Sequence, residues 1–162
     1  MKTFKFLGTY VSNDLTWNTN CTAILKKTRQ RIYFLRQLKT YHVNTSVLTQ
    51  FYRAIIESVL SYSITTWFDR ATQSDLQKLS SVIRQAEKIV GEKLPTLEDI
   101  YLQRLTKKTG QIMKDCFHPA YKYFEFLPSG RRLRHFKGSP RFLNSTYPQA
   151  VKFYNNLRKS RL

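Results

Sequence analysis

The chain has 162 residues, of which 41% are hydrophobic and 14% aromatic, and this composition excludes an intrinsically disordered protein. Its 28 lysines and arginines face only 10 aspartates and glutamates, so the net charge is +18 and a polyanion is the expected partner, nucleic acid first and an anionic membrane surface second. No apolar run suits a signal peptide or a membrane span, and Cys21 and Cys116 form no disulfide framework, which indicates an intracellular, nuclear or cytoplasmic protein.

The first expected element is a β-hairpin within residues 1–18. The stretch Phe-Lys-Phe-Leu-Gly-Thr-Tyr-Val at residues 4–11 has the alternation and the aromatic content of a strand. Ser12-Asn13-Asp14 suits a turn, and a second short strand would follow it up to Trp17. No later stretch reads as a strand, so this apolar hairpin has no evident sheet to pair with.

After the hairpin, the apolar period changes from two to about 3.6, which predicts helices. The first is expected over residues 22–39 and the second over residues 46–67, with Asn44, Thr45 or Ser46 as its N-cap. The first helix has a stripe of Ile24, Thr28, Ile32, Leu35 and Leu38, and the second has Leu48, Phe51, Tyr52, Ile55, Val59 and Tyr62.

Two further helices and a tail complete the expected fold. The third helix begins near Thr72 or Ser74 and ends at Gly91, and the fourth follows Pro95 with Thr96 as its cap. Beyond residue 125 there are nine lysines and arginines and no acid, and a short last helix is expected from Pro148 to Leu157. The fold class is mainly α: an N-terminal β-hairpin, an antiparallel bundle of about four helices, and a basic, turn-rich tail with a short last helix. The expected segments are residues 1–18, 19–70, 71–125 and 126–162.

Residues for catalysis or metal binding do not assemble into any known pattern. Cys116 and His118 lie close in sequence, but two ligands are too few for a metal site. Cys116 is instead expected to be a buried apolar residue at a helix end. No His-x-Asp pair suits a non-haem iron oxygenase, and Ser129 lacks the neighbours of a nucleophile. The sequence therefore predicts a chain that is not an enzyme and needs no cofactor or metal.

The charge pattern instead predicts binding to an RNA or DNA backbone. Between Asp14 and Glu57 there is no acidic residue, while basic residues accumulate there. Because such contacts release counterions from phosphates, binding should weaken steeply with salt and depend little on base sequence. The candidate phosphate contacts are Lys26, Lys27, Arg29, Arg36 and Lys39 in the first helix, and Arg131, Arg132 and Arg134 in the tail.

The order of these segments resembles the C-terminal part of a non-LTR (LINE-type) retrotransposon reverse transcriptase. Residues 4–11 are similar to the Phe-x-x-Leu-Gly hairpin of its primer grip, residues 26–38 to its basic thumb helix, and residues 51–60 to the helix that follows. Later stretches at 86–91, 94–100, 127–132 and 147–151 look like the region after the thumb. The resemblance implies that Phe6, Leu7 and Gly8 form the primer grip, that the first-helix cations contact phosphates, and that a palm domain encoded upstream would carry the hairpin's sheet and the paired catalytic aspartates.

Residues 25–65 are also similar to a segment found at the N-terminus of the AlkB-homologue tRNA-repair protein. This second resemblance implies a different function, linked to RNA modification, as a 2-oxoglutarate dioxygenase or a tRNA methyltransferase. The composition is also compatible with a basic helical module that binds a membrane surface or a protein partner, and with a degenerate fragment that has no function.

Overall fold

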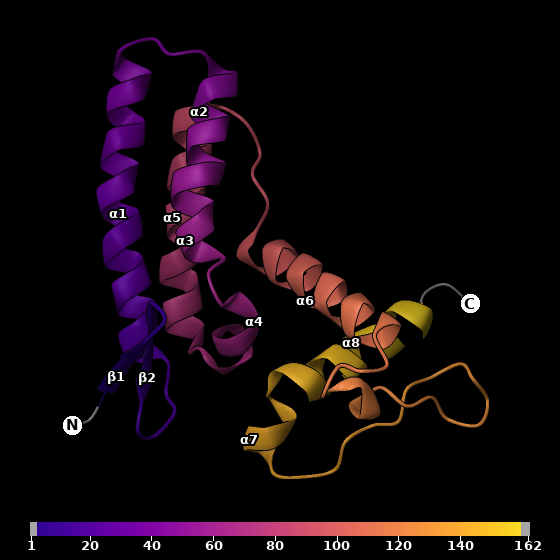
Figure 1. The fold of residues 1–162 in the computed structure, drawn as a ribbon. Helices are drawn as coiled ribbons and strands as arrows, with labels where there is room; N and C mark the ends of the chain where they lie inside the picture. Colours follow the sequence, from indigo (N-terminus) through magenta and orange to yellow (C-terminus); the bar gives the residue numbers. More distant parts are fainter. Residues whose placement is uncertain (1–2, 160–162) are drawn as a thin grey trace. The chain divides into compact units, whose positions relative to one another are not determined.

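The computed structural model describes residues 3–159 (Figure 1). The chain divides into two compact units, one running to Tyr101 and the other starting at Leu102, and each is described by itself. Helices dominate both units, and an antiparallel hairpin opens the first. The predicted mainly α fold with an N-terminal hairpin is therefore confirmed.

The hairpin pairs β1 (Thr3–Phe6) with β2 (Thr9–Ser12), and Phe6 faces Thr9 at its closed end. Leu7 and Gly8 form the two-residue loop, with φ of 45° and 86°. Positive φ at both loop residues is typical of a type I′ turn, whose twist matches that of the strands. The prediction of one strand over residues 4–11 with its turn at residues 12–14 was wrong, because an apolar Leu7 concealed the turn. Residues 13 and 14 instead lead from β2 into a local turn in which the Asp14 carboxylate accepts the Thr16 amide at 3.0 Å.

The first unit is built around a helical bundle of α1, the helical segment 45–60 and α5. α1 (Asn18–Thr40) begins four residues before the predicted start, and its buried side includes Cys21, Ile24, Thr28, Ile32 and Leu35. α1 and α5 (Gln73–Val90) pack along each other and run in the same direction, while the segment between them runs the opposite way (Figure 1). The apolar stripe of α1 is therefore shared between two neighbours.

The predicted helix 46–67 is interrupted. α2 (Thr45–Phe51) leads into the π-helix η1 (Tyr52–Glu57) and the short α3 (Ser58–Leu60); a bend follows, then α4 (Ile64–Trp67) and the 3₁₀ turn η2 (Phe68–Arg70). A π-helix has wider turns than an α-helix, so residues four apart stay on one face through it. The fully buried side chains follow this spacing: Leu48, Tyr52, Ile56, Leu60 and Ile64. Ile55 and Tyr62, predicted as core from a 3.6-residue period, are instead 37% and 49% exposed.

The boundaries of α5 were predicted from its capping residues. The Thr72 hydroxyl accepts the Asp75 amide at 3.1 Å, and Gly91 closes the helix with φ of 86°. α6 (Leu97–Lys114) begins in the first unit, where the Thr96 hydroxyl accepts the Asp99 amide at 3.1 Å, and continues into the second. Both caps match the sequence prediction.

The second unit is held together by aromatic contacts and by one asparagine. Its elements after α6 are the 3₁₀ turn η3 (Tyr121–Tyr123), α7 (Pro140–Leu143) and α8 (Thr146–Lys159), which begins two residues before the predicted Pro148. The buried Asn155 amide accepts the Leu133 N–H at 2.8 Å and donates to the Leu133 carbonyl at 3.0 Å, so α8 fixes the preceding loop. The rings of Tyr123, Phe124, Phe136, Phe142 and Tyr147 contact one another.

Candidate nucleic-acid interface

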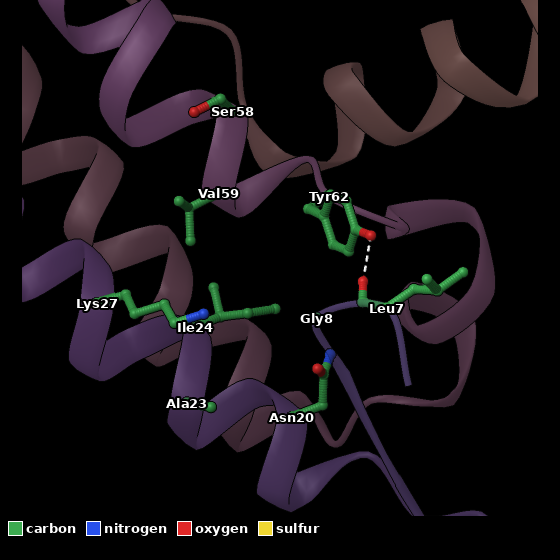
Figure 2. Close-up of a pocket in the computed structure, with 9 residues that line it drawn as sticks. All are labelled: Leu7, Gly8, Asn20, Ala23, Ile24, Lys27, Ser58, Val59 and Tyr62. Atoms are coloured by element: carbon green, nitrogen blue, oxygen red, sulfur yellow. Dashed lines mark hydrogen bonds between the residues drawn. The ribbon is translucent and has the colours of Figure 1, made fainter. Parts of the chain in front are cut away.

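The tip of the hairpin, α1 and the end of α3 enclose a cleft of about 270 Å³ (Figure 2). Its wall and floor come from segments far apart in the sequence, which only the bundle brings together. The lining residues are Leu7, Gly8, Asn20, Ala23, Ile24, Lys27, Ser58, Val59 and Tyr62. Two of the three primer-grip-like residues thus line the same cleft as Lys27 of the basic helix, whereas Phe6 is 59% exposed and does not line it.

Side-chain hydrogen bonds fix the hairpin tip in this position. The Tyr62 hydroxyl donates to the Leu7 carbonyl (Figure 2), and the Tyr10 amide donates to Asn20 Oδ1 at 3.1 Å. A Cβ on Gly8 would lie 3.5 Å from the Tyr62 ring, which is ordinary contact, so the demand for glycine there comes from its φ of 86°. The first turn of α1 therefore holds β2, and the bend after the 45–60 segment holds the loop.

Asn20 is the most constrained polar group of the cleft. Its side chain is 3% exposed, and among residues 3–159 its Nδ2 has no hydrogen-bond partner. The described lining residues include no aspartate or glutamate, while the Lys27 amine and the Ser58 hydroxyl can donate. The cleft is rich in donors and has an apolar floor.

The predicted phosphate contacts of α1 lie on opposite flanks of the helix. Residues three or seven apart share a face, so Lys26, Arg29, Arg36 and Lys39 follow one side, and all four are exposed. Arg36 on this side donates to Gln85 of α5 at 3.3 Å. Lys27 lies on the other flank with Arg31, whose guanidinium donates to the Ile55 carbonyl of η1. The five residues therefore do not form one stripe.

α5 extends the first of these flanks. Lys78 lies seven residues before Gln85 and Lys88 lies three after it, so both belong to the α5 face that meets Arg36, and both are exposed. Arg29 and Lys78 are separated by the same number of positions as Arg36 and Gln85, which is 49. Because α1 and α5 run in the same direction, Arg29 and Lys78 should lie at the same height along the two helices. We call this set the α1–α5 surface: Arg29, Arg36, Lys78, Gln85 and Lys88.

In the second unit, Arg131, Arg132 and Arg134 belong to a tight turn and the segment that leaves it. The Gly130 amide donates to the Leu127 carbonyl at 2.8 Å, and the Leu127 amide donates to the Arg132 carbonyl at 2.8 Å. A β-bridge between Phe126 and Leu133 closes the loop, and all three arginines are exposed. This turn lies in the tail that was expected to be turn-rich, and Gly130 adopts a φ of 65° in it.

Sequence patterns did not identify Asn20, Tyr62 or the cations of α5 as site residues. Tyr62 was predicted to be core, and Lys78 and Lys88 occur among acids, so their local sequence is not acid-free. Cys116, predicted to be buried, is exposed, because α6 ends before it. Its neighbour His118 accepts the Ala120 amide at 3.0 Å.

Burial and nearby charge alter the acidity of groups in the first unit. Burial raises the pKa of the Cys21 thiol to about 12, with a smaller effect from Asp75. Burial, with the carboxylates of Glu57 and Glu87 nearby, also raises the pKa of Tyr52. Hydrogen bonds from Ser12 and Thr16 lower the pKa of Asp14 to about 2.

Neither a metal site nor a membrane span is found in the described part of the chain. Across residues 3–159, no three histidine, cysteine, aspartate or glutamate side chains come together as a metal would require. Among the same residues, the helices are too short or too polar to cross a bilayer.

One comparison with known proteins gives a match. The family described as alkylated DNA repair protein alkB homolog 8, N-terminal, matches residues 17–58, which contain α1, α2 and η1. The similarity expected over residues 25–65 is thus confirmed with shifted bounds. No curated protein and no solved structure matches the chain, and the resemblance to reverse transcriptases gains no support from these comparisons.

Proposed function

We propose that this protein binds the sugar-phosphate backbone of RNA or DNA with little dependence on base sequence. The observation that carries the proposal is the α1–α5 surface, where the exposed Arg29, Arg36, Lys78 and Lys88 lie on the two helix faces that the Arg36–Gln85 hydrogen bond joins. Each cation that neutralises a phosphate releases counterions, which favours binding to any strand. The net charge of +18 adds long-range attraction of the same sign.

The spacing on α1 suits a strand that follows the helix. Seven residues separate Arg29 from Arg36, which is about 10.5 Å of helix rise. In a stacked strand, phosphates follow one another at about 3.4 Å along the axis, so this interval corresponds to about three nucleotides. Both guanidiniums can therefore contact one strand without bending it.

Within this function, the chain is proposed to act as the primer grip and thumb of a reverse transcriptase. The support is the resemblance of the sequence together with the cleft that Leu7 and Gly8 share with Lys27 of the basic helix. Phe4 and Phe6 lie on the same face of β1 and are each 59% exposed, which suits packing on a sheet of another polypeptide or domain. Such a palm sheet would have to supply the catalytic aspartates.

A second candidate function rests on the family match. Similarity of residues 17–58 to the N-terminal family of alkB homolog 8 favours a role beside an RNA- or DNA-repair activity. Turnover of methylated RNA or DNA by the purified chain with iron and 2-oxoglutarate, or RNA methylation with S-adenosylmethionine, would favour it over backbone binding alone.

The test of backbone binding is the salt dependence of affinity. Fluorescence anisotropy with single-stranded RNA, single-stranded DNA and their hybrid should give similar affinities for unrelated sequences, falling linearly with the logarithm of salt. The triple variant Arg29→Gln, Arg36→Gln, Lys78→Gln should reduce the slope by about 2, since each contact to a single strand contributes about 0.7.

A charge-matched control separates the α1–α5 surface from the overall charge. The variant Lys5→Gln, Arg53→Gln, Lys93→Gln removes three exposed cations of the same unit away from that surface. Its slope should stay close to that of the unaltered protein. Equal slopes for both triple variants would contradict the proposed surface, and preference for anionic vesicles over RNA in competition would support membrane-surface binding instead.

A further inference from the structure

The cleft at the hairpin tip has the composition of a small-ligand site. Ala23, Ile24 and Val59 provide apolar surface, and Lys27 and Ser58 provide donors at its sides (Figure 2). Its volume of about 270 Å³ lies just under the range of ordinary ligand pockets, about 300 to 1,000 Å³. It therefore suits one planar group with its substituents and is too small for two.

Asn20 indicates what kind of group the cleft would take. A buried donor without a partner costs about 1–3 kcal/mol, and Asn20 Nδ2 is such a donor among the described residues. Its Oδ1 is already occupied by the Tyr10 amide at 3.1 Å, which fixes the orientation of the side chain. The free N–H groups therefore require an acceptor, such as a carbonyl oxygen, from a molecule that enters the cleft.

We propose that this cleft holds a single unpaired nucleotide, with its base on Ile24 and Val59, a hydrogen-bond acceptor of the base on Asn20 Nδ2, and its phosphate on Lys27. The inference rests on the proposed backbone binding and names the unit that this end of the interface recognises. Every base presents an acceptor to this donor, a carbonyl oxygen in uracil, cytosine, thymine and guanine and a ring nitrogen in adenine, so the cleft should require a base without selecting one. The unpaired nucleotide can be free or part of a strand.

Two variants test the cleft without removing its hydrogen bond to the hairpin. Asn20→Asp keeps Oδ1 for the Tyr10 amide and replaces the donor by a carboxylate oxygen. Ala23→Leu adds volume to the half-buried wall and changes no polar group. Circular dichroism and the melting temperature establish that each variant folds, and Ala23→Leu alone decides the test if the buried carboxylate unfolds Asn20→Asp.

The first measurement uses uridine 5′-monophosphate and ribose 5-phosphate, which lacks the base, in ¹⁵N–¹H NMR titrations. Uridine 5′-monophosphate should shift the Asn20 side-chain amide and the Gly8 backbone amide, with an affinity at least threefold above that of ribose 5-phosphate. Ala23→Leu should weaken this binding at least fivefold. Unchanged Asn20 and Gly8 signals at millimolar nucleotide would overturn the inference for free nucleotides.

The second measurement uses a short oligouridine and the same strand with abasic sites. The unaltered protein should bind the oligouridine at least fivefold more tightly, and Ala23→Leu should abolish this difference while leaving the salt slope unchanged. Equal binding of both strands by the unaltered protein, with a normal salt slope, overturns the cleft inference and leaves backbone binding intact. Loss of binding to every strand, with nucleotide still bound in the cleft, overturns the proposed function instead.

Discussion

The hydroxyl of Tyr62 donates a hydrogen bond to the carbonyl oxygen of Leu7, and so joins the bend after the 45–60 helical segment to the hairpin loop across 55 positions of sequence. With the bond from the Tyr10 amide to Asn20, it holds the hairpin against the bundle from two sides. Phe4 and Phe6 of the same hairpin are largely exposed, so apolar burial contributes little to keeping β1 in place. The polar contacts therefore matter more here than in the core.

Replacing Tyr62 with Phe should loosen the hairpin selectively. A hydrogen bond contributes about 1 kcal/mol net, and Tyr62 is half-exposed, so the global free energy of unfolding should fall by at most that amount. Hydrogen exchange should accelerate at the amides of β1 and β2 and stay unchanged in α1 and α5. Tyr41→Phe, at a side chain 76% exposed, is the matched control and should alter neither. Equal acceleration in hairpin and bundle would contradict the selective role of Tyr62.

Tyr52→Phe should stabilise the protein and weaken its sensitivity to alkali. The Tyr52 ring is fully buried, and among residues 3–159 its hydroxyl has no hydrogen-bond partner. Removing this hydroxyl should therefore raise the free energy of unfolding by about 1 kcal/mol at pH 7. Because burial raises the pKa of folded Tyr52 above its usual value of 10.0, the stability from keeping it neutral is present below pH 10 and is lost as the pH rises further.

The measurement is urea unfolding of both proteins from pH 7 to 11. The free energy of unfolding should fall less steeply above pH 10 in Tyr52→Phe than in the unaltered protein. The Cys21 thiol, whose pKa is raised to about 12, lowers the free energy of unfolding further above pH 9. This decrease should be the same in both proteins. A variant that is less stable at pH 7, or one with the same alkaline slope, would contradict the assignment.

Elements defined by short-range chemistry were predictable from the sequence. Thr72 and Gly91 delimit α5, and Thr96 begins α6, because a capping hydroxyl and a glycine at positive φ act within a few residues. The mainly α class followed from the apolar period in the same way. These features depend on neighbours along the chain, and no tertiary contact changed them.

Elements that depend on tertiary contacts were not predictable. The π-helix η1 shifts the buried face to every fourth residue, and this spacing moved Ile55 and Tyr62 out of the core. Leu7 has a positive φ that few residues other than glycine adopt, so its turn had no clear local signal. The cleft needs residues from three segments, and the donor that marks it, Asn20, lies at the first turn of a helix without any distinctive pattern.

Substitution by alanine should destabilise the protein at one glycine and stabilise it at another. Gly91 has φ of 86°, so alanine there should cost about 1 kcal/mol even though no atom lies within 4 Å of the new Cβ. Gly110 lies inside α6 with equally open surroundings, so alanine there should stabilise by about 1 kcal/mol through helix propensity. Urea midpoints at a constant m-value measure both changes. A destabilised Gly110→Ala would show a packing role for that glycine.

The arginines of the tail should contribute to nucleic-acid binding through charge alone. Arg131 and Arg132 are exposed on a turn closed by backbone hydrogen bonds, so replacing both with Gln should leave the fold of the second unit unchanged. If both contact phosphates of single-stranded RNA, the salt slope should fall by about 1.4. The double variant Lys107→Gln, Lys108→Gln removes the same charge from the exposed face of α6 and should change the slope less. A slope that is unaffected by the arginine variant would restrict the phosphate contacts of this protein to its first unit.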